Sequence, residues 1–409
     1  MLKRLADIWA SLRRYGWRSP EALLLLLGAA SALSFATWMA LLNNFAVERA
    51  AFTGAEMGIL QSLREVPGFL AFTAVFVLLL LREQPFALLS LALLGLGTAL
   101  TGFFPSVVGL YCTTIIMSIG FHYNETLQQS LALQWVGKER APIVLGRVIA
   151  AASLASLGGY ALIWAAFELA GTDYLVVYLV GGGLTVAAAL FAWLAYPQFP
   201  AKVEQHKTLI LRPRYWLYYA LVFFSGARRQ IFIVFAGFMM VEKFGYTVGN
   251  ITLLFLINYA ANVWLAPAIG HLIKRWGDRK ALTVEYIGLI VVFTSYAFVE
   301  SAMLAATLYV IDHLFFAMAI AIKTYFQKIA DVPDIAPTAA VAFTINHIAA
   351  VFLPALLGYL WITSPTSVFM LAAAMAALAI ALAAMIPRNP EKGNETVFSA
   401  LRRSATPAE

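Results

Sequence analysis

The chain has 409 residues, of which 62% are hydrophobic and only 12% are charged, and its formal net charge is +7 at pH 7. Soluble domains carry about 25% charged residues, so a soluble globule of this length could not bury so much apolar surface. The composition therefore excludes an ordinary soluble protein and favours one that lies in a membrane.

Long apolar runs account for most of the chain. Crossing a hydrocarbon core of ~30 Å takes about 20 helical residues, and about a dozen runs are long enough. In chain order we expect membrane-spanning helices at residues 22–44, 57–81, 86–104, 107–135, 143–168, 175–197, 215–241, 249–273, 281–300, 302–327, 338–361 and 366–386. The sequence thus predicts an all-α membrane protein with twelve transmembrane helices.

The segment that precedes the first span, residues 1–19, alternates apolar side chains such as Leu2 and Ile8 with basic ones such as Arg4 and Arg13. This pattern indicates an amphipathic helix on the inner membrane surface, although an unstructured basic tail is the alternative. A cleavable signal peptide fits poorly, because the following apolar run is too long and has no small-residue cleavage site.

The basic residues mark the topology of the chain. If the amino terminus is cytoplasmic, then among Lys and Arg outside the spans only Arg49 and Lys243 fall on the opposite side. This bias places both termini in the cytoplasm. We expect a multi-pass integral protein of a bacterial cytoplasmic (inner) membrane, with lipid and not nucleic acid as its partner. The single cysteine, Cys112, excludes a disulfide framework.

The two halves of the chain repeat each other. Residues 47–53 return 194 positions later at 241–247, and residues 125–132 resemble 323–330. Such a repeat in an apolar chain indicates two bundles related by pseudo-symmetry, which usually carry a substrate between them. We therefore predict five parts, which are an amphipathic amino-terminal segment, a six-helix bundle, a polar cytoplasmic linker, a second six-helix bundle and a cytoplasmic tail of disordered composition. Their bounds are 1–19, 20–197, 198–214, 215–387 and 388–409.

A glycine-rich basic motif follows the eighth span. It consists of Gly270, Leu272, Arg275, Gly277, Arg279 and Lys280. It resembles the signature loop of the major facilitator superfamily, Gly-x-Leu-x-Asp-Arg-x-Gly-Arg-Arg. In that family the loop usually lies between spans 2 and 3, with a weaker copy between spans 8 and 9, so this chain has the reverse arrangement. A basic loop that merely obeys the topology is the alternative, but it does not explain the glycine spacing.

The resemblance covers residues 20–390 and implies two pseudo-symmetric six-helix bundles, a central path lined by spans 1, 4, 7 and 10, and a loop that gates conformational change. In the loop, Gly270 would allow close helix approach and Gly277 a tight turn. Lys274 occupies the family's Asp position, so Asp278 or Glu285 are the candidates for the missing acid. We expect Glu285 near the cytoplasmic end, within reach of this loop.

Several spans contain ionisable residues, which cost at least about 2.5–3.5 kcal/mol at the bilayer centre and normally face a cavity or a partner. His122, Glu125 and Gln129 share one helical face. A buried carboxylate beside a histidine suits proton coupling. The alternative is that Glu125 is a permanent counter-ion of an arginine or of Lys323. The proton-coupling candidates are His122, Glu125, Asp312 and Glu65.

Arg228 and Arg229 lie about halfway along the seventh span. Adjacent residues project ~100° apart, so one should face the cavity and the other a neighbouring helix or carboxylate. A guanidinium offers a planar fork for carboxylate or phosphate. Alternatively, Glu65, Glu125 or Asp312 neutralise both arginines, which then only hold the bundles together. The substrate-binding candidates are Arg228, Arg229, Lys323, Arg64, Asn258, Asn346, Tyr325 and Gln129.

Together these features predict a secondary transporter of a small solute by alternating access. Four intramembrane cations against Glu65, Glu125 and Asp312 favour a small organic anion coupled to protons. The alternatives are a proton-driven exporter of lipophilic drugs and an assembly factor of this fold that transports nothing. We expect a monomer. We expect no enzymatic activity, cofactor or metal, because no P-loop lysine or zinc-ligand spacing is present. Symport or antiport, and import or export, stay open.

Overall fold

The computed structural model describes residues 16–136, 141–200, 211–331 and 334–399, and these residues are helical almost throughout. No β-strand occurs among them, although one isolated bridge joins Glu391 and Asn394. The elements are, in order, α2 (Pro20–Ala50), α3 (Gly54–Phe69), η1 (Ala71–Thr73), α4 (Ala74–Val77), α5 (Glu83–Thr101), α6 (Val107–Trp135), α7 (Ala141–Glu168), α8 (Tyr174–Ala195), η2 (Pro213–Tyr215), α9 (Trp216–Ile231), η3 (Phe232–Ala236), α10 (Gly237–Glu242), α11 (Val248–Trp276), α12 (Asp278–Phe298), α13 (Ala302–Phe316), η4 (Ala317–Ala319), α14 (Ile320–Ile329), α15 (Ile335–Thr363) and α16 (Pro365–Ala384).

The helices follow the apolar runs of the sequence. Every predicted span overlaps one or more helices, and within the described ranges nine helical stretches are long and apolar enough to cross a membrane. Such helices satisfy their own backbone hydrogen bonds, which is the condition for a segment that lies in hydrocarbon. The expectation of an all-α membrane protein is therefore confirmed.

Three of the predicted spans are interrupted, which the sequence analysis did not predict. The second breaks after Pro67 into α3, η1 and α4. The seventh contains the π-helical turn η3, and the tenth contains the 3-10 turn η4. Proline removes a backbone donor, and π-turns occur frequently at functional sites. The interruptions in the seventh and tenth spans begin within five residues after Arg228 and Asp312, so they accompany buried charges.

Contacts within the chain divide it into two compact units. Unit 1 consists of Met1–Phe52, Leu63–Gln205 and Tyr246–Leu256, and unit 2 consists of Thr53–Ser62, His206–Gly245 and Ile257–Glu409. Two helices, α3 and α11, therefore belong partly to each unit. The segment of α3 that belongs to unit 2 and the segment of α11 that belongs to unit 1 are called the exchanged segments. The repeat offset of 194 carries residues 54–62 of α3 onto residues 248–256 of α11, so the two exchanged segments are equivalent in the repeat.

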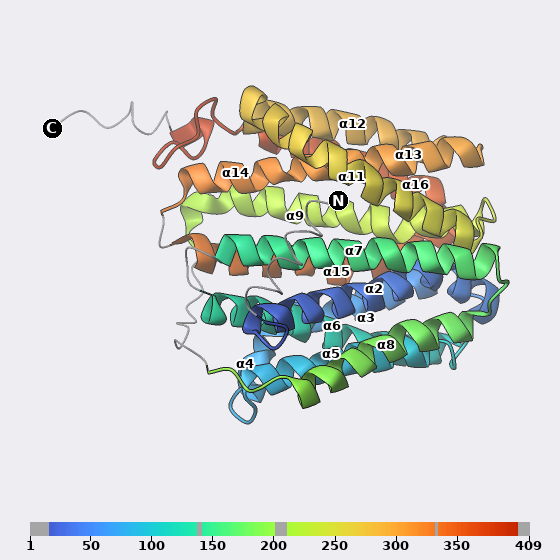
Figure 1. Cartoon of the computed structure of the whole chain (residues 1–409). Helices are drawn as coiled ribbons and strands as arrows, with labels where there is room; N and C mark the ends of the chain where they lie inside the picture. The colour runs from blue at the N-terminus through green and yellow to red at the C-terminus, as the bar shows by residue number, and fades with distance from the viewer. Residues whose placement is uncertain (1–15, 137–140, 201–210, 332–333, 400–409) are drawn as a thin grey trace. The chain divides into compact units, whose positions relative to one another are not determined.

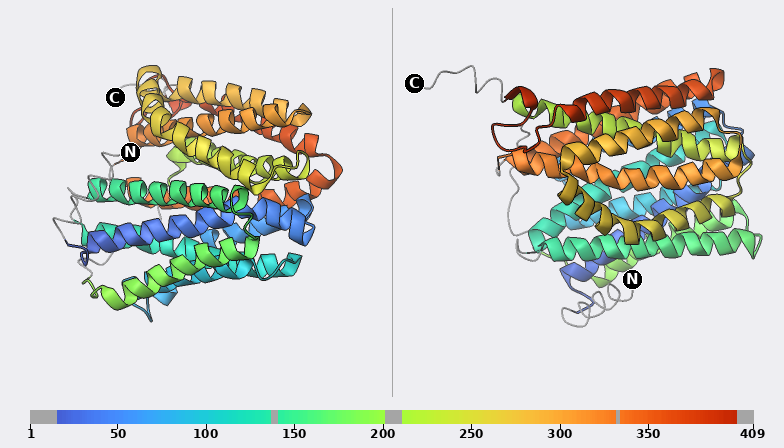
Figure 2. Two further views of the ribbon diagram at one scale, coloured as in Figure 1. Left: turned by 45° about the vertical axis from the view of Figure 1, so that its right-hand side comes forward. Right: turned by 90° about the horizontal axis from the view of Figure 1, so that it is seen from above.

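Glycines set the close packing of unit 1. Helix α5 lies between α6 and α8, and α2 lies beside α7 (Figures 1 and 2). A Cβ atom on Gly97 would lie 2.4 Å from the backbone nitrogen of Met117, and one on Gly182 would lie 2.3 Å from that of Ala99. Small residues allow helix backbones in membranes to approach this closely. Gly181 and Gly182 of the Gly-Gly-Gly run at 181–183 thus serve helix packing.

In unit 2, α9 packs on α15 and α12 packs on α16. A Cβ atom on Gly226 of α9 would lie 2.1 Å from Oδ1 of Asn346 of α15. Near the opposite end of these helices, the Trp361 ring stacks on Phe235 at 5.2 Å and meets Phe369 at 5.7 Å. These contacts bring the last turns of α9, where the paired arginines lie, against α15.

The chain beyond α16 is folded as far as it is described. The amide of Val397 donates to the carbonyl of Met385 at 2.9 Å, and the side chains of Glu395 and Thr396 are buried. Disorder was predicted for 388–409 from composition, which is wrong for residues 388–399, because local turns satisfy their polar groups. Residues 400–409, residues 1–15 of the amphipathic segment and residues 201–210 of the linker lie outside the described residues. The domain boundaries stay a prediction.

Candidate functional site

Helix α9 separates its two arginines. Arg228 is 2% exposed, whereas Arg229 is exposed. Nη2 of Arg228 lies 3.2 Å from Oε1 of Glu285. Both guanidinium groups lie near the ring of Phe316, at 5.3 Å for Arg228 and 5.7 Å for Arg229. The 100° separation of adjacent residues thus places one arginine against a neighbouring carboxylate and leaves the other on the surface of the helix.

A second carboxylate shares the environment of Arg228. Asp312 of α13 and Glu285 of α12 are both completely buried, and Arg228 interacts electrostatically with each. We refer to Arg228, Glu285 and Asp312 as the buried charge cluster. The expectation that Glu285 reaches the basic loop is wrong, because α12 directs this carboxylate toward α9.

The buried charge cluster is poor in hydrogen bonds. Within the described part of the chain, the carboxylate oxygens of Glu285 and Asp312 and the hydroxyl of Tyr286 have no hydrogen-bond partner. The contact between Arg228 and Glu285 is therefore an ion pair without regular hydrogen-bond geometry. A buried pair repays its loss of hydration only when further hydrogen bonds satisfy it. One guanidinium beside two carboxyl groups can chemically accommodate one additional positive charge.

The backbone around this cluster departs from α-helix on both flanking spans. The π-turn η3 follows Arg228 in the seventh span, and the 3-10 turn η4 follows Asp312 in the tenth. The ring of Phe232 in η3 lies 4.7 Å from that of Tyr309, one turn before Asp312. Broken helices in transporters commonly supply ion and substrate sites, since irregular backbone is tolerated only inside protein or beside a cavity.

Unit 1 contains a different arrangement of buried charge. Arg64 and Glu65, 5% and 7% exposed, are adjacent in α3 and form an ion pair. Arg64 also lies against Sδ of Met39 at 3.7 Å and 5.9 Å from the ring of Trp38. The hydroxyl of Ser118 donates to the carbonyl of Arg64. This arginine is thus neutralised by its neighbour in the sequence.

The polar face of α6 divides between interior and surface. His122 is 6% exposed and its ring contacts Phe121 at 5.1 Å, whereas Glu125 and Gln129 are exposed. Gln128 donates to the carbonyl of Leu24 at 3.0 Å, which ties α6 to α2. The proton-coupling candidates of this helix therefore do not share one buried site.

The remaining substrate candidates of unit 2 are scattered. Lys323 of α14 is exposed, and Asn258 of α11 is buried. Asn346 is partly exposed and faces Gly226, two residues before Arg228. Tyr325 is fully buried, and its hydroxyl donates to the carbonyl of Glu395 at 2.5 Å. Tyr325 thus binds the segment after α16, and we leave it out of the proposed substrate site.

The signature-like loop is anchored by its own acid. Gly277 has φ +79°, a conformation that favours glycine, and begins α12. Asp278, 2% exposed, accepts hydrogen bonds from Lys328 at 2.6 Å and from Thr324 at 2.5 Å. Asp278 therefore ties the loop to α14.

The other members of the loop are more open. Lys274, Arg275 and Lys280 are exposed and Arg279 is partly buried, while Gly270 lies within α11. The ammonium group of Lys280 lies 5.4 Å from the ring of Trp276. Of the two acids considered for the position that Lys274 occupies, Asp278 makes the contact with a basic residue near the loop.

Sequence reasoning missed the contact of Glu285 with Arg228 and the hydrogen bonds of Thr324 and Lys328 to Asp278. A carboxylate within an apolar run was a usable signal for Glu285, since such a group seeks a buried partner. The sequence could not identify that partner, because Arg228 lies 57 positions away on a different helix. Lys328 resembled an ordinary basic residue at a helix end.

Comparison with known proteins gives the family. The model of the Major Facilitator Superfamily matches residues 22–345 and 219–407. A search of curated protein sequences gave no match.

Solved structures show the same fold at low sequence identity. A crystal structure of a mutant of the nucleoside transporter NupG has a TM-score of 0.74 and 14% identity, covering 90% of this chain and all of its own. An inward-facing, unoccupied bacterial homologue of the human lysosomal transporter Spinster has a TM-score of 0.68 and 14% identity, covering 89% of this chain and 95% of its own. Family model, helical content and fold agree, so the chain belongs to the major facilitator superfamily of membrane transporters.

Proposed function

We propose that this protein carries a small organic anion across the membrane by alternating access and couples this movement to protons. We further propose that it acts as a monomer in a bacterial cytoplasmic membrane, with both termini in the cytoplasm. The observation that supports coupling is the buried charge cluster, in which one arginine faces two carboxyl groups.

Charge balance is the argument for proton binding. With both carboxyl groups ionised, the cluster would hold one net negative charge in a region with no exposure. An uncompensated charge of this kind is costly inside a membrane protein. A proton on Glu285 or Asp312 removes it, and loss of that proton in another conformation would couple the cluster to transport. Glu125, the earlier candidate, is exposed and suits this role less well.

The argument for an anion rests on two exposed cations of unit 2, Arg229 and Lys323. The excess of intramembrane cations expected from the sequence disappears once Glu285 joins the buried set. Among the intramembrane charges considered above, Arg64, Arg228, Arg229 and Lys323 then stand against Glu65, Glu125, Glu285 and Asp312. Arg147 of the fifth span pairs with Glu21. We assign Arg229 to the substrate because it is exposed, whereas Arg64 and Arg228 are buried against carboxylates.

A ligand screen tests the substrate class. Purified protein in detergent is heated with small carboxylates, organic phosphates, a nucleoside and lipophilic cations, at pH 6 and pH 8. An anion should raise the melting temperature, since a ligand that binds the folded state stabilises it. Arg229→Gln should abolish this rise, whereas Arg388→Gln, which removes an exposed charge after α16, should keep it.

The other outcomes identify the alternatives. Stabilisation by the nucleoside alone would replace the anion by a neutral solute, and stabilisation by lipophilic cations alone would favour a drug exporter. If no ligand class stabilises the protein and Arg229→Gln melts normally, an assembly factor without transport becomes the better explanation.

Proton coupling is tested in liposomes that contain a pH-sensitive dye. Addition of the ligand found in the screen should move protons with the wild-type protein but not with Asp312→Asn or Glu285→Gln. Glu125→Gln is the matched control, because it removes an exposed carboxylate. Loss of proton movement in Glu125→Gln alone would transfer the coupling role to α6.

A further inference from the structure

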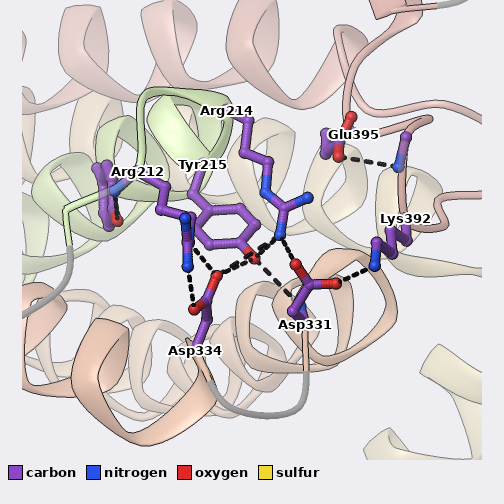
Figure 3. Close-up of polar contacts among 9 residues, drawn as sticks. Arg212, Arg214, Tyr215, Asp331, Asp334, Lys392 and Glu395 are labelled. Atoms are coloured by element: carbon purple, nitrogen blue, oxygen red, sulfur yellow. Dashed lines mark hydrogen bonds and ion pairs between the residues drawn. The ribbon is translucent and has the colours of Figure 1, made fainter.

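Three segments of unit 2 that are distant in the sequence meet in one polar network (Figure 3). They are the residues that lead into α9, the turn between α14 and α15, and the chain that follows α16. Two aspartates of the turn, Asp331 and Asp334, connect them. This network includes none of the residues of the buried charge cluster.

The first link joins the turn to the start of α9. Arg212 donates to both oxygens of Asp334 through Nε and Nη2, the latter at 2.9 Å. Arg214 donates to Asp331, and the hydroxyl of Tyr215 donates to Asp334 at 3.0 Å. The same hydroxyl accepts from the amide of Asp331 at 3.1 Å. A fork-like arginine pair of this kind fixes geometry as well as charge.

The second link joins the turn and α14 to the chain after α16. Nζ of Lys392 lies 2.6 Å from Oδ1 of Asp331. The buried hydroxyl of Tyr325 donates to the carbonyl of Glu395. The side chain of Glu395 turns back to accept from the amide of Gly393 at 2.9 Å. Residues 392–396 are therefore held both by charge and by a buried hydrogen bond.

At neutral pH the charges of the network favour the contacts just described. Hydrogen bonds from Lys392 and Arg214 lower the pKa of Asp331 below its usual range. The contact with Arg212 does the same for the pKa of Asp334. Both aspartates thus remain ionised, and each can hold its basic partners.

The network bears on the tenth span because of the break within it. Helix α14 follows the 3-10 turn η4, which separates it from α13 and Asp312. The second half of α14 is held to the segment after α16 through Tyr325 and to the first residue of α12, Asp278, through Lys328. Short 3-10 stretches within a span often mark hinges. Release of the segment after α16 would remove one of these two restraints.

We infer that residues 387–399 form a clasp, which locks α14 against the start of α9 and must open before α14 can turn about η4. The inference goes beyond the proposed function, since it requires neither an anion nor a proton. It assigns to the chain after α16 a regulatory role in the movement of the discontinuous tenth span.

The clasp is tested by cysteine accessibility in full-length protein. Cys112 is exposed, so the background is Cys112→Ser. Thr396→Cys reports the clasp, since this position is 5% exposed, and Met318→Cys reports η4, since that position is also 5% exposed. Maleimide labelling of both should be slow. Lys392→Gln should accelerate both rates by at least about threefold, which is the effect expected for loss of one ion pair, and Asp331→Asn should act more strongly.

Arg388→Gln is the matched control, because it removes an exposed cation from the same segment. Hydrogen exchange of residues 391–399 in the variants without added cysteines gives a second measurement, which does not depend on tolerance of a cysteine at 396. The clasp would be overturned if Thr396→Cys is labelled fast and residues 391–399 also exchange hydrogen fast in the protein without added cysteines. Equal rates in Lys392→Gln and Arg388→Gln would overturn it as well. Faster labelling at 396 without any change at 318 would overturn the link to α14.

Discussion

The two units bury arginine in different ways. In unit 1, Arg64 is matched by one carboxylate, Glu65, which is its neighbour in the sequence. In unit 2, Arg228 faces two carboxylates from two other helices, Glu285 and Asp312. A balanced pair on one helix can be neutral in every conformation of the protein. An unbalanced set drawn from three helices changes its energy whenever those helices move, which is why we place the proposed proton binding in unit 2.

The largest effect is expected when the cation of unit 2 is removed. Arg228→Met leaves two carboxyl groups buried without a counter-ion, and removing one partner of a buried pair costs about 3–5 kcal/mol. The melting temperature in detergent should fall strongly at pH 8. The double variant Arg228→Met with Glu285→Gln should recover much of the loss. Arg229→Gln is the control, and a similar loss in that variant would mean that exposure does not distinguish the two arginines.

Removal of a carboxylate should have opposite signs in the two units. Glu65→Gln leaves Arg64 unpaired and should destabilise the protein by roughly 3 kcal/mol. Asp312→Asn removes the surplus charge of unit 2 and leaves the Arg228–Glu285 pair, so stability at pH 8 should stay unchanged or rise. Thermal melting of both variants measures this difference. If Asp312→Asn lowers the melting temperature as much as Glu65→Gln does, the buried charge cluster carries no surplus negative charge and the two units do not differ in this respect.

The two units also differ in the ion pairs at their surfaces, and changes to these pairs should have smaller effects on the structure than changes to the buried charges. Unit 1 has the exposed pair Arg49–Asp173, whereas unit 2 has the polar network in which Asp331 and Asp334 bind Arg214 and Arg212. The folded state lowers the pKa of both Asp331 and Asp334, so their stabilising contribution is complete above the unfolded value of about 3.9 and is lost as pH falls through the folded value. A nitroxide attached through Thr396→Cys should become more mobile as pH falls below about 3.9.

The control for this titration is the Asp331→Asn variant. It lacks one of the two titrating groups, so its nitroxide should already be more mobile at pH 5 and change less on acidification. If acidification makes the nitroxide more mobile already above pH 5 and has no further effect below it, groups other than these aspartates cause the change.

Hydropathy and the turn motif predicted much of the fold, because both depend on residues that are close in the sequence. Every apolar run contains helix, and the motif at Gly277 forms the turn that its glycine suggested. The breaks at η3 and η4 were not predictable in this way. A run of apolar residues has the same hydropathy whether its backbone is a regular α-helix or contains a π or 3-10 turn imposed by tertiary packing.

The candidate site was predicted only in part, for a physical reason. Helical periodicity established that Arg228 and Arg229 point in different directions, but it could not say which of them is buried. That choice depends on the helix that packs on each face. For the same reason Glu285 was assigned to the wrong partner. The polar segment after α16 was expected to be disordered, because its composition does not reveal that Tyr325 supplies a buried donor for its backbone.

The exchanged segments of α3 and α11 have a consequence for how this protein is made. Unit 1 includes residues 246–256, so its packing stays incomplete until the ribosome has synthesised more than half of the second repeat's first two helices. Residues 53–62, made early, must wait for unit 2 before they find their neighbours. The first six spans are therefore synthesised before either unit is complete, and each unit is completed only with a segment from the other half of the chain.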